Sequence, residues 1–195
     1  MSVQKYSVNQ YSIQTLISWI QSFDIAIPEI QRPFVWDATK VRDFIDSLYC
    51  GYPVGYLIAW RNPNIRLKDG SISTGKRILI DGQQRVTAIM AALLGMEIVD
   101  KDYRKKRITI AFNPIDKQFK VADAAIRKDK KWISDIADIF KANFSLLSFI
   151  KEYCNNNPDI EENNIFKNVE LLKNIVNNSL GLIELNADLD IDAVT

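Results

Sequence analysis

Apolar residues recur with the spacing of one helix face in several segments of the chain. The spacing i, i+3, i+4, i+7 predicts an amphipathic helix wherever it is sustained. This spacing is found in residues 12–22, in a segment that Asp37 can cap and Gly51 can end, in residues 83–94, and in residues 132–155 and 159–178. We therefore expect helices near the start, in the middle and over most of the last third of the chain.

Extended segments are indicated by apolar runs that turn residues bound on both sides. Pro28 and Pro33 exclude a continuous helix from the stretch IAIPEIQRPFVWD. The patterns predict buried strands at residues 54–60 and 76–80, a turn at Asp69-Gly70, a hairpin around Asn113-Pro114 and a last strand at residues 180–186. This order of elements predicts an α+β fold (mixed α/β), with a small sheet flanked by helices.

Composition places the chain among ordinary globular proteins. It has 195 residues, of which 47% are hydrophobic and 25% charged. No apolar run approaches the roughly 20 residues of a membrane helix, and the N-terminus has no signal-peptide pattern, so we expect a cytoplasmic protein without membrane contact. Cys50 and Cys154 lie far apart in the sequence and are expected to be two buried thiols. The final stretch NADLDIDAVT carries no stop signal, which favours a piece of a longer protein, although a disordered tail fits equally.

Charge and residue type narrow the chemistry. The chain has no histidine, which excludes catalytic triads, histidine zinc sites and histidine-dependent nucleases. Catalysis would therefore depend on carboxylates, amides, arginine, lysine, tyrosine or a carboxylate-bound ion such as Mg²⁺. Residues 1–135 hold 21 Lys and Arg against 14 Asp and Glu, a net charge of +7, whereas residues 136–195 carry −6. The first part is thus suited to anionic ligands, although ordinary surface variation explains the same numbers.

The pentad Asp81-Gly82-Gln83-Gln84-Arg85 stands between a predicted strand and a predicted helix. Amides of a first helical turn have no intrahelical partners and the helix dipole is positive there, so such a join can seat an anion. Gly82 permits a close backbone approach, Arg85 can hold a phosphate with two hydrogen bonds, and Asp81 can bind Mg²⁺, a ribose hydroxyl or Arg85 itself. A capped turn with a surface arginine explains the same residues.

Three other groups of residues can likewise be interpreted either as part of a binding site or as ordinary structural residues. Gln31 and Arg32 can face the pocket of Arg85 or lie in a surface loop. Tyr52 and Tyr56 can stack on a base or pack beside their glycine turns. The basic clusters at residues 104–107 and 127–131 can contact nucleic acid or form solvated edges.

Three motifs in this order carry a family resemblance: IPEIQRPFVWD, SLYCGYPVGYLIAW and ILIDGQQRVTAI. Together they resemble the DGQQR-motif family, the N-terminal part of GmrSD-type type IV restriction enzymes and related phage-defence proteins. The resemblance implies a ParB/sulfiredoxin-like fold in which a turn at a helix N-terminus receives nucleotide phosphates. It assigns catalysis to Asp81, Gln84 and Arg85, nucleotide binding to Gln31, Arg32, Gly82, Gln83 and Arg85, and a Mg²⁺ ion to Asp81.

The resemblance also implies an organisation and a set of partners. Residues 1–130 would form the nucleotide-binding domain, and residues 131–195 a helical extension that begins a larger helical region. The expected function is binding, with hydrolysis, of a nucleoside triphosphate in a prokaryotic defence protein. Expected partners are DNA, through the full-length protein, and a nuclease domain or subunit that this histidine-free chain does not supply as an HNH site. A DNA-backbone-binding module and a protein-docking module without catalysis are the alternatives.

Overall fold

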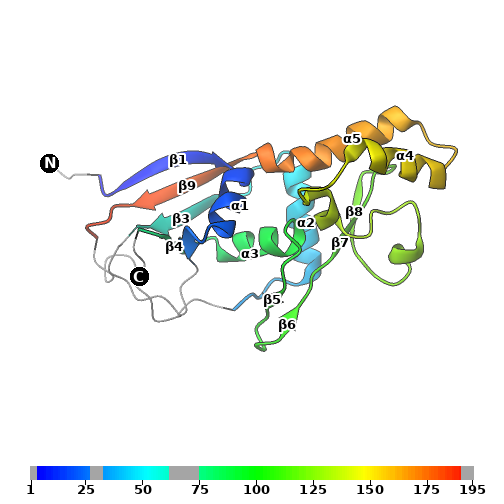
Figure 1. Cartoon of the computed structure of the whole chain (residues 1–195). Helices are drawn as coiled ribbons and strands as arrows, with labels where there is room; N and C mark the ends of the chain where they lie inside the picture. The colour runs from blue at the N-terminus through cyan, green and yellow to red at the C-terminus, as the bar shows by residue number, and fades with distance from the viewer. Residues whose placement is uncertain (1–3, 27–32, 62–74, 190–195) are drawn as a thin grey trace. The chain divides into compact units, whose positions relative to one another are not determined.

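The computed structural model describes residues 4–26, 33–61 and 75–189 (Figure 1). Its residues divide into two compact units that interleave along the sequence. The first unit comprises Met1–Arg32, Pro53–Val86 and Val176–Thr195, and the second comprises Pro33–Tyr52 and Thr87–Ile175. The expected division into residues 1–130 and 131–195 stays a prediction.

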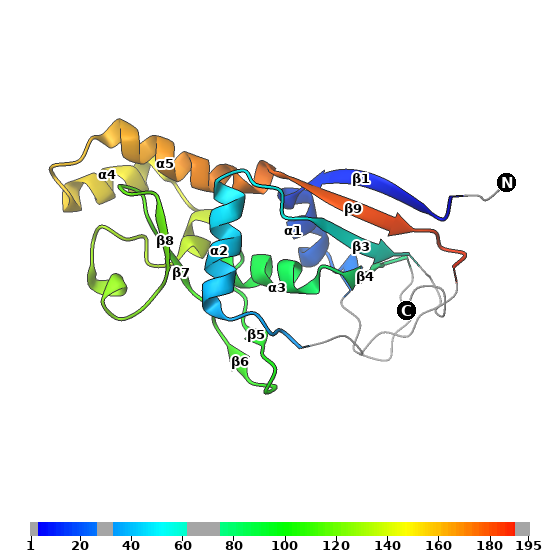
Figure 2. The same cartoon turned by 180° about the vertical axis from the view of Figure 1, so that it is seen from behind.

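A five-stranded mixed sheet forms the centre of the first unit, with the strand order β1-β9-β3-β4-β2. Its strands are β1 (Tyr6–Ser12), β2 (Ile25–Ala26), β3 (Tyr56–Trp60), β4 (Arg77–Asp81) and β9 (Ser179–Leu185). β9 pairs antiparallel with β1 and parallel with β3, and Figures 1 and 2 both show β1 and β9 side by side. The strands expected near residues 54–60, 76–80 and 180–186 are confirmed. The strand β1 was not expected from the sequence.

Helix α1 (Ile13–Gln21) follows β1 directly. Ser12 caps it, because its side-chain oxygen accepts a hydrogen bond of 3.1 Å from the Thr15 amide. The buried residues of α1 are Ile13, Leu16, Ile17 and Ile20. These four residues are the predicted apolar stripe, so the periodicity identified both the helix and the face it buries.

The second unit pairs helix α2 (Ala38–Tyr49) with the hairpin of β7 (Ile110–Asn113) and β8 (Gln118–Val121). Asp37 caps α2 as predicted, since its carboxylate accepts a 2.7 Å hydrogen bond from the Lys40 amide. The rings of Tyr49, Phe112 and Phe119 form an aromatic cluster between helix and hairpin, with centroids 4.7 to 5.4 Å apart. The hairpin expected around Asn113 is confirmed.

The segment from Trp132 to Phe144 is not the helix that its apolar pattern predicts. Ile133 instead exchanges two main-chain hydrogen bonds of 2.8 and 2.9 Å with Phe112, which extends the backbone there. Only a short 3₁₀ helix, η2 (Ile136–Phe140), precedes helix α4 (Leu146–Asn156). Pairing with β7 therefore overrides the local helical pattern in this segment.

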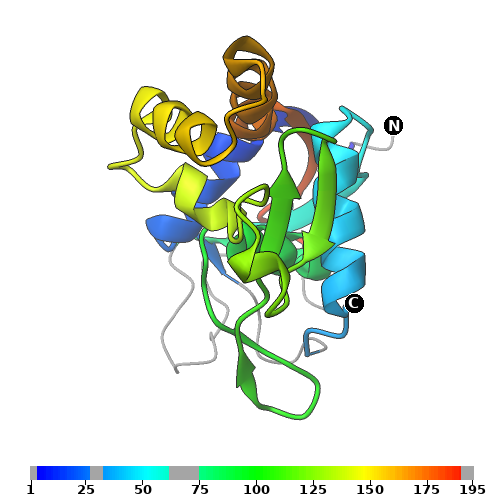
Figure 3. The same cartoon turned by 90° about the vertical axis from the view of Figure 1, so that its right-hand side faces the viewer.

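The remaining elements of the second unit are helical, apart from a second, short hairpin. Helix α5 (Glu162–Asn174) packs against α4 (Figure 3). The short elements are the hairpin β5 (Ile98–Val99) with β6 (Lys105–Lys106) and the 3₁₀ helix η1 (Ile126–Lys128), whereas the 3₁₀ helix η3 (Ile175–Asn177) begins in the second unit and ends in the first. Cys50, after α2, is exposed and Cys154, in α4, is partly exposed, so the expected burial of both thiols is wrong. Helix α3 (Gln83–Ala92) begins in the first unit and ends in the second. Helices combined with small mixed sheets confirm the predicted α+β class.

Candidate functional site at the β4–α3 junction

Gly82 joins β4 to α3 in a conformation that favours glycine. Asp81 is the last residue of β4, Gln83 is the first of α3, and Gly82 lies between them, buried and with a φ of +93°. A Cβ at this position would clash with Cδ2 of Leu57, a β3 residue. The amides of Arg85 and Val86 both donate to the Gly82 carbonyl at 3.0 Å, which starts the helical ladder immediately. The positive φ expected at Gly82 is thus confirmed, and Leu57 fills the space that a Cβ would occupy.

The Arg85 guanidinium is held by two oxygens of the same unit. Nη1 donates to the Val54 carbonyl at 2.9 Å, and Nη2 lies 3.1 Å from Oδ2 of Asp81. The Arg85 side chain is 19% exposed, whereas that of Asp81 is 65% exposed. Arg85 is therefore not the freely solvated surface charge of the simpler interpretation. Of the three partners expected for Asp81, Arg85 is the one that contacts it.

The Arg85 guanidinium lies so close to Gly55 that no side chain fits there, a contact that the sequence did not indicate. Gly55 has a φ of +84°, and a Cβ built on it would lie 2.5 Å from Nη1 of Arg85. The motif SLYCGYPVGYLIAW thus supplies a carbonyl oxygen and an open backbone face to the arginine of ILIDGQQRVTAI. Two motifs that are separate in the sequence form one structural site in the first unit.

The other predicted site residues are placed differently. Gln83 and Gln84 lie half-buried in the first turn of α3. Gln31 and Arg32 lie outside the described residues, as does the Asp69-Gly70 turn, so the role of Gln31 and Arg32 beside Arg85 stays a prediction. Tyr56 is 54% exposed and its ring lies against Gly181 on the neighbouring strand β9.

Asp81 is not accompanied, among the described residues, by the further carboxylate or thiol ligands of a metal site built by protein alone. Within residues 4–26, 33–61 and 75–189, no three His, Cys, Asp or Glu side chains gather at one place. Mg²⁺ characteristically takes one or two carboxylates and completes its shell with substrate phosphates and water. The exposed Asp81 fits that arrangement and does not fit a site closed by protein ligands.

The basic cluster at residues 104–107 separates into two parts. Arg107 belongs to the fold, because it donates to the carbonyls of Ala91 and Ile108 and lies 2.7 Å from Oδ2 of Asp135. Arg104 and Lys105 are exposed. The exposed part of this cluster is therefore the one that remains available to a ligand.

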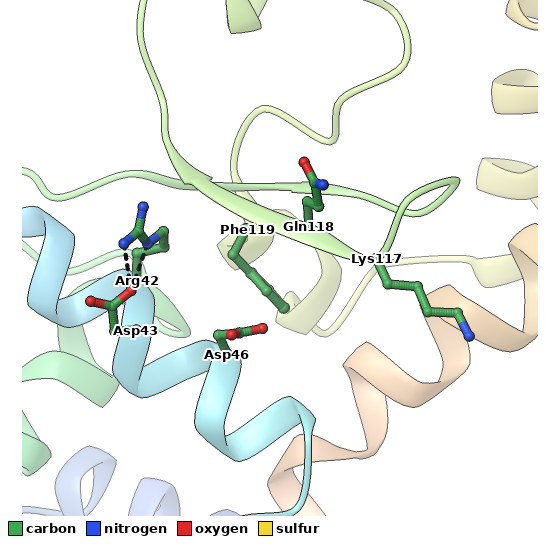
Figure 4. Close-up of a pocket in the computed structure, with 6 residues that line it drawn as sticks. All are labelled: Arg42, Asp43, Asp46, Lys117, Gln118 and Phe119. Carbon is green, nitrogen blue, oxygen red and sulfur yellow. Dashed lines mark hydrogen bonds and ion pairs between the residues drawn. The ribbon is translucent and has the colours of Figure 1, made fainter.

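A surface pocket in the second unit lies between α2 and β8 (Figure 4). Its volume is about 310 Å³, and it is lined by Arg42, Asp43, Asp46, Lys117, Gln118 and Phe119. Arg42 donates to Asp43 at 2.5 and 2.8 Å, so the only arginine of this lining is already paired. No sequence signal indicated this pocket, because its residues read as the solvated side of a helix and a hairpin end.

The sequence of the chain matches a class of domain found in restriction enzymes. The sequence model for the N-terminal domain of GmrSD restriction endonucleases matches residues 13–194, and the chain belongs to this family. No curated protein matches the chain closely enough to add to that assignment. None of the helices that the structure describes is both long and apolar enough to span a bilayer.

Proposed function

We propose that the β4–α3 junction binds the phosphates of a nucleoside triphosphate, and that the chain is the nucleotide-binding and hydrolysing domain of a prokaryotic anti-phage restriction protein. The observation that carries this proposal is the pairing of Gly82 and Arg85. A buried glycine with positive φ stands at the N-terminus of α3, and a positioned guanidinium lies close to its backbone. Membership in the restriction family supports the biological role.

The phosphate seat combines three favourable features. The main-chain amide of Gln83, the first residue of α3, stands at the positive end of this helix, where phosphates bind to other helices. Gly82 lets the Arg85 guanidinium lie close to the backbone of the turn, since a Cβ there would stand 3.4 Å from Nη2 and would clash with Leu57. Arg85 is fixed by the Val54 carbonyl, so a phosphate that contacts its guanidinium costs little side-chain entropy.

Asp81 explains why binding would need a divalent cation. Asp81 is paired with Arg85, so a triphosphate that binds the Arg85 guanidinium would leave the Asp81 carboxylate beside the phosphates without its counter-charge. Bound Mg²⁺ would neutralise phosphate charge, and Asp81 together with phosphate oxygens would hold it. Arg85 would stabilise charge that develops on the transferred phosphoryl group, and Gln84 would orient the attacking water. Gln83, Gln31 and Arg32 are proposed as further nucleotide contacts.

Calorimetric titration of the chain with each of the four ribonucleoside triphosphates, with Mg²⁺ or with EDTA, tests the proposal. Wild type should bind more tightly with Mg²⁺. Asp81→Asn should remove most of this Mg²⁺ dependence and lower hydrolysis about 100-fold or more, the scale of one lost electrostatic contact in a transition state. Asp138→Asn is the matched control, since Asp138 is an exposed carboxylate paired with Lys141 at 2.5 Å in the other unit. This variant should behave as wild type.

Two results would count against the proposal. Absence of binding by wild type for all four nucleotides would contradict the phosphate seat. Equal Mg²⁺ dependence in wild type and Asp81→Asn would contradict the role of Asp81 while leaving the seat itself intact.

A docking function without catalysis is the second candidate. It is favoured by the contacts of Arg85 with Asp81 and Val54, which suffice to make the pentad a structural lock between β3, β4 and α3. The chain would then hold a nuclease domain or subunit, and DNA would be engaged by the full-length protein. This candidate predicts that Asp81→Asn lowers stability and leaves nucleotide affinity absent in both proteins.

A further inference from the structure

The β5–β6 hairpin presents an aromatic ring to solvent at its tip. Tyr103 is 82% exposed, the largest fraction among the large hydrophobic side chains in the described part of the chain. Val99 pairs with Lys105 and Ile98 with Lys106, so residues 100–104 form the connecting loop. Figures 1 and 3 show this hairpin extending away from β7, β8, α4 and α5 of the same unit.

Asp100 fixes the conformation of this loop through four hydrogen bonds. Its carboxylate accepts the amides of Asp102 and Arg104 at 2.9 and 3.0 Å. Its main-chain carbonyl accepts the Tyr103 amide, and its own amide donates to the Arg104 carbonyl, both at 3.0 Å. The side chain and main chain of Asp100 therefore organise the loop in advance, and its exposed residues are held in a defined arrangement.

The backbone of Tyr103 is unusual for an aromatic residue. Its φ is +58°, in the left-handed region that glycine and asparagine adopt more readily. A turn selected only for stability would carry glycine here. Packing of the ring does not offset the backbone strain, because most of the ring surface is in water. Strain retained at an exposed position points to a contact that the ring makes with a partner.

The charges around the ring select the partner. Lys101, Arg104 and Lys105 are exposed, against one exposed carboxylate at Asp102. The charge of Asp100 is directed into the loop, where main-chain hydrogen bonds, first that of Arg104, lower the pKa of its carboxyl group. The tip is therefore cationic around a flat apolar ring. An acidic peptide would use the cations and leave the ring without a matching surface, whereas an apolar protein face would have to desolvate the cations.

We propose that the β5–β6 hairpin binds nucleic acid, with an unpaired base stacked on Tyr103 and the flanking phosphates held by Arg104 and Lys105. Aromatic rings interleaved with cations bind single strands in this way, because every base offers a flat face and every linkage a charge. The residues of this surface belong to the second unit and those of the phosphate seat to the first, and the proposed binding requires neither nucleotide nor Mg²⁺.

The test is fluorescence anisotropy with the whole chain in EDTA and without nucleotide. The probes are a labelled DNA single strand of about 20 nucleotides, enough to cover more than one typical site, its RNA counterpart and the DNA duplex. The ring is tested by Tyr103→Gly and by Tyr103→Phe, which keeps a stacking face. The cations are tested by the double variant Arg104→Ala/Lys105→Ala. Its matched control is Arg127→Ala/Lys128→Ala, which removes an exposed Arg-Lys pair from η1 in the same unit.

Tyr103→Gly gives the sharpest expectation, because it should raise the melting temperature while weakening single-strand binding by about tenfold or more. Tyr103→Phe should bind as wild type. Arg104→Ala/Lys105→Ala should lower the slope of log K against log salt by about 1.4, since each phosphate contact contributes about 0.7 for single strands. The Arg127/Lys128 control should leave that slope unchanged.

Three results with the single strands would overturn the proposal: no binding of either strand by wild type at low salt, equal affinity of wild type and Tyr103→Gly, or equal losses in the two Arg-Lys double variants. Tighter binding of RNA or of DNA identifies the source of the unpaired base and supports the shared chemistry. Duplex binding that is equal to single-strand binding and insensitive to Tyr103 would also overturn it.

Discussion

Gly82 is the residue at which backbone geometry most constrains the candidate site. Two separate costs would follow from a side chain there: the positive φ, and the clash of a Cβ with Leu57. Gly51 bears only the first cost, since it has a φ of +76° and open space where its Cβ would stand. These two glycines therefore allow conformational strain to be separated from steric exclusion.

Gly82→Ala should lower the free energy of unfolding by roughly 1 to 3 kcal/mol more than Gly51→Ala, because overpacking adds to strain. Urea titration followed by circular dichroism measures both variants. Equal losses would mean that Leu57 moves aside at no cost, and the close approach of β3 to Gly82 would then not require glycine.

Two tyrosines of the second unit differ in how their hydroxyl groups are satisfied. The Tyr153 hydroxyl donates to the Lys131 carbonyl at 2.8 Å. The Tyr49 hydroxyl is buried and has no hydrogen-bond partner within the described residues. Removal of a hydroxyl should therefore have opposite consequences at the two positions.

Tyr153→Phe should destabilise the protein by about 1 kcal/mol, since it leaves a main-chain carbonyl without its donor. Tyr49→Phe should be neutral or stabilising, because it removes a polar atom that gains nothing from burial. Paired thermal melts at neutral pH compare them. A loss at Tyr49 as large as that at Tyr153 would show that the Tyr49 hydroxyl has a partner in solution.

Arg77 connects three elements of the first unit. From β4 its Nε donates to Glu184 of β9 at 3.0 Å, across the intervening strand β3. Its guanidinium carbon lies 3.7 Å from the ring centroid of Trp19, in α1. The Arg77 and Glu184 side chains are only 11% and 18% exposed. Breaking a pair this sheltered costs more than breaking an exposed one, because the remaining charge is left with little solvent around it.

Arg77→Met should cost about 1 to 3 kcal/mol, below the usual range for a fully buried pair, because Glu184 keeps contacts with Asn9 and Arg61. Arg42→Met, which breaks the more exposed pair with Asp43, should change stability by about 0.5 kcal/mol or less. Denaturant unfolding of both variants decides between them. A comparable loss from Arg42→Met would contradict the importance assigned to burial.

Elements with a strong apolar period were predictable from the sequence, and those fixed by a distant partner were not. The stripes of α1 and α2 and their caps Ser12 and Asp37 are local signals that operate within one helical turn. Strand β1 buries none of its side chains fully, so it has no apolar signal, and only its pairing with β9 defines it. Ile133 likewise adopts its conformation from Phe112, a residue 21 positions earlier.

The same distinction applies to the candidate site. The strand-to-helix pentad and the freedom required at Gly82 follow from residues 78–94 alone. The contact of Arg85 with Val54 and Gly55 does not, because these residues lie about 30 positions away and meet it only once β3 and β4 pair. The sequence alone therefore indicates only a turn at Gly55. In the structure, Gly55 also leaves room for the guanidinium.

At the scale of the whole molecule, the second unit contains the groups that govern stability in alkali. Burial, followed by the charges of Cys50 and Asp46, raises the pKa of Tyr49 from 10.0 to about 12. Burial, followed by the charge of Asp129, raises the pKa of Tyr153 still further. The folded protein therefore holds these two protons more tightly than the unfolded chain does, so folding is favoured below pH 10 and loses this contribution as the pH rises.

The free energy of unfolding of wild type should accordingly fall between about pH 10 and pH 12, with each tyrosine contributing at most about 1.4 kcal/mol per pH unit. Tyr49→Phe/Tyr153→Phe lacks both protons and should show a shallower decline, although it starts from a different stability at neutral pH. Urea titrations at a series of alkaline pH values measure the two slopes, and the difference between them removes contributions that the proteins share, such as those of the lysines. Parallel declines would mean that the two hydroxyls ionise as easily in the folded protein as in the unfolded chain, and the aromatic cluster of Tyr49, Phe112 and Phe119 would then be open to water.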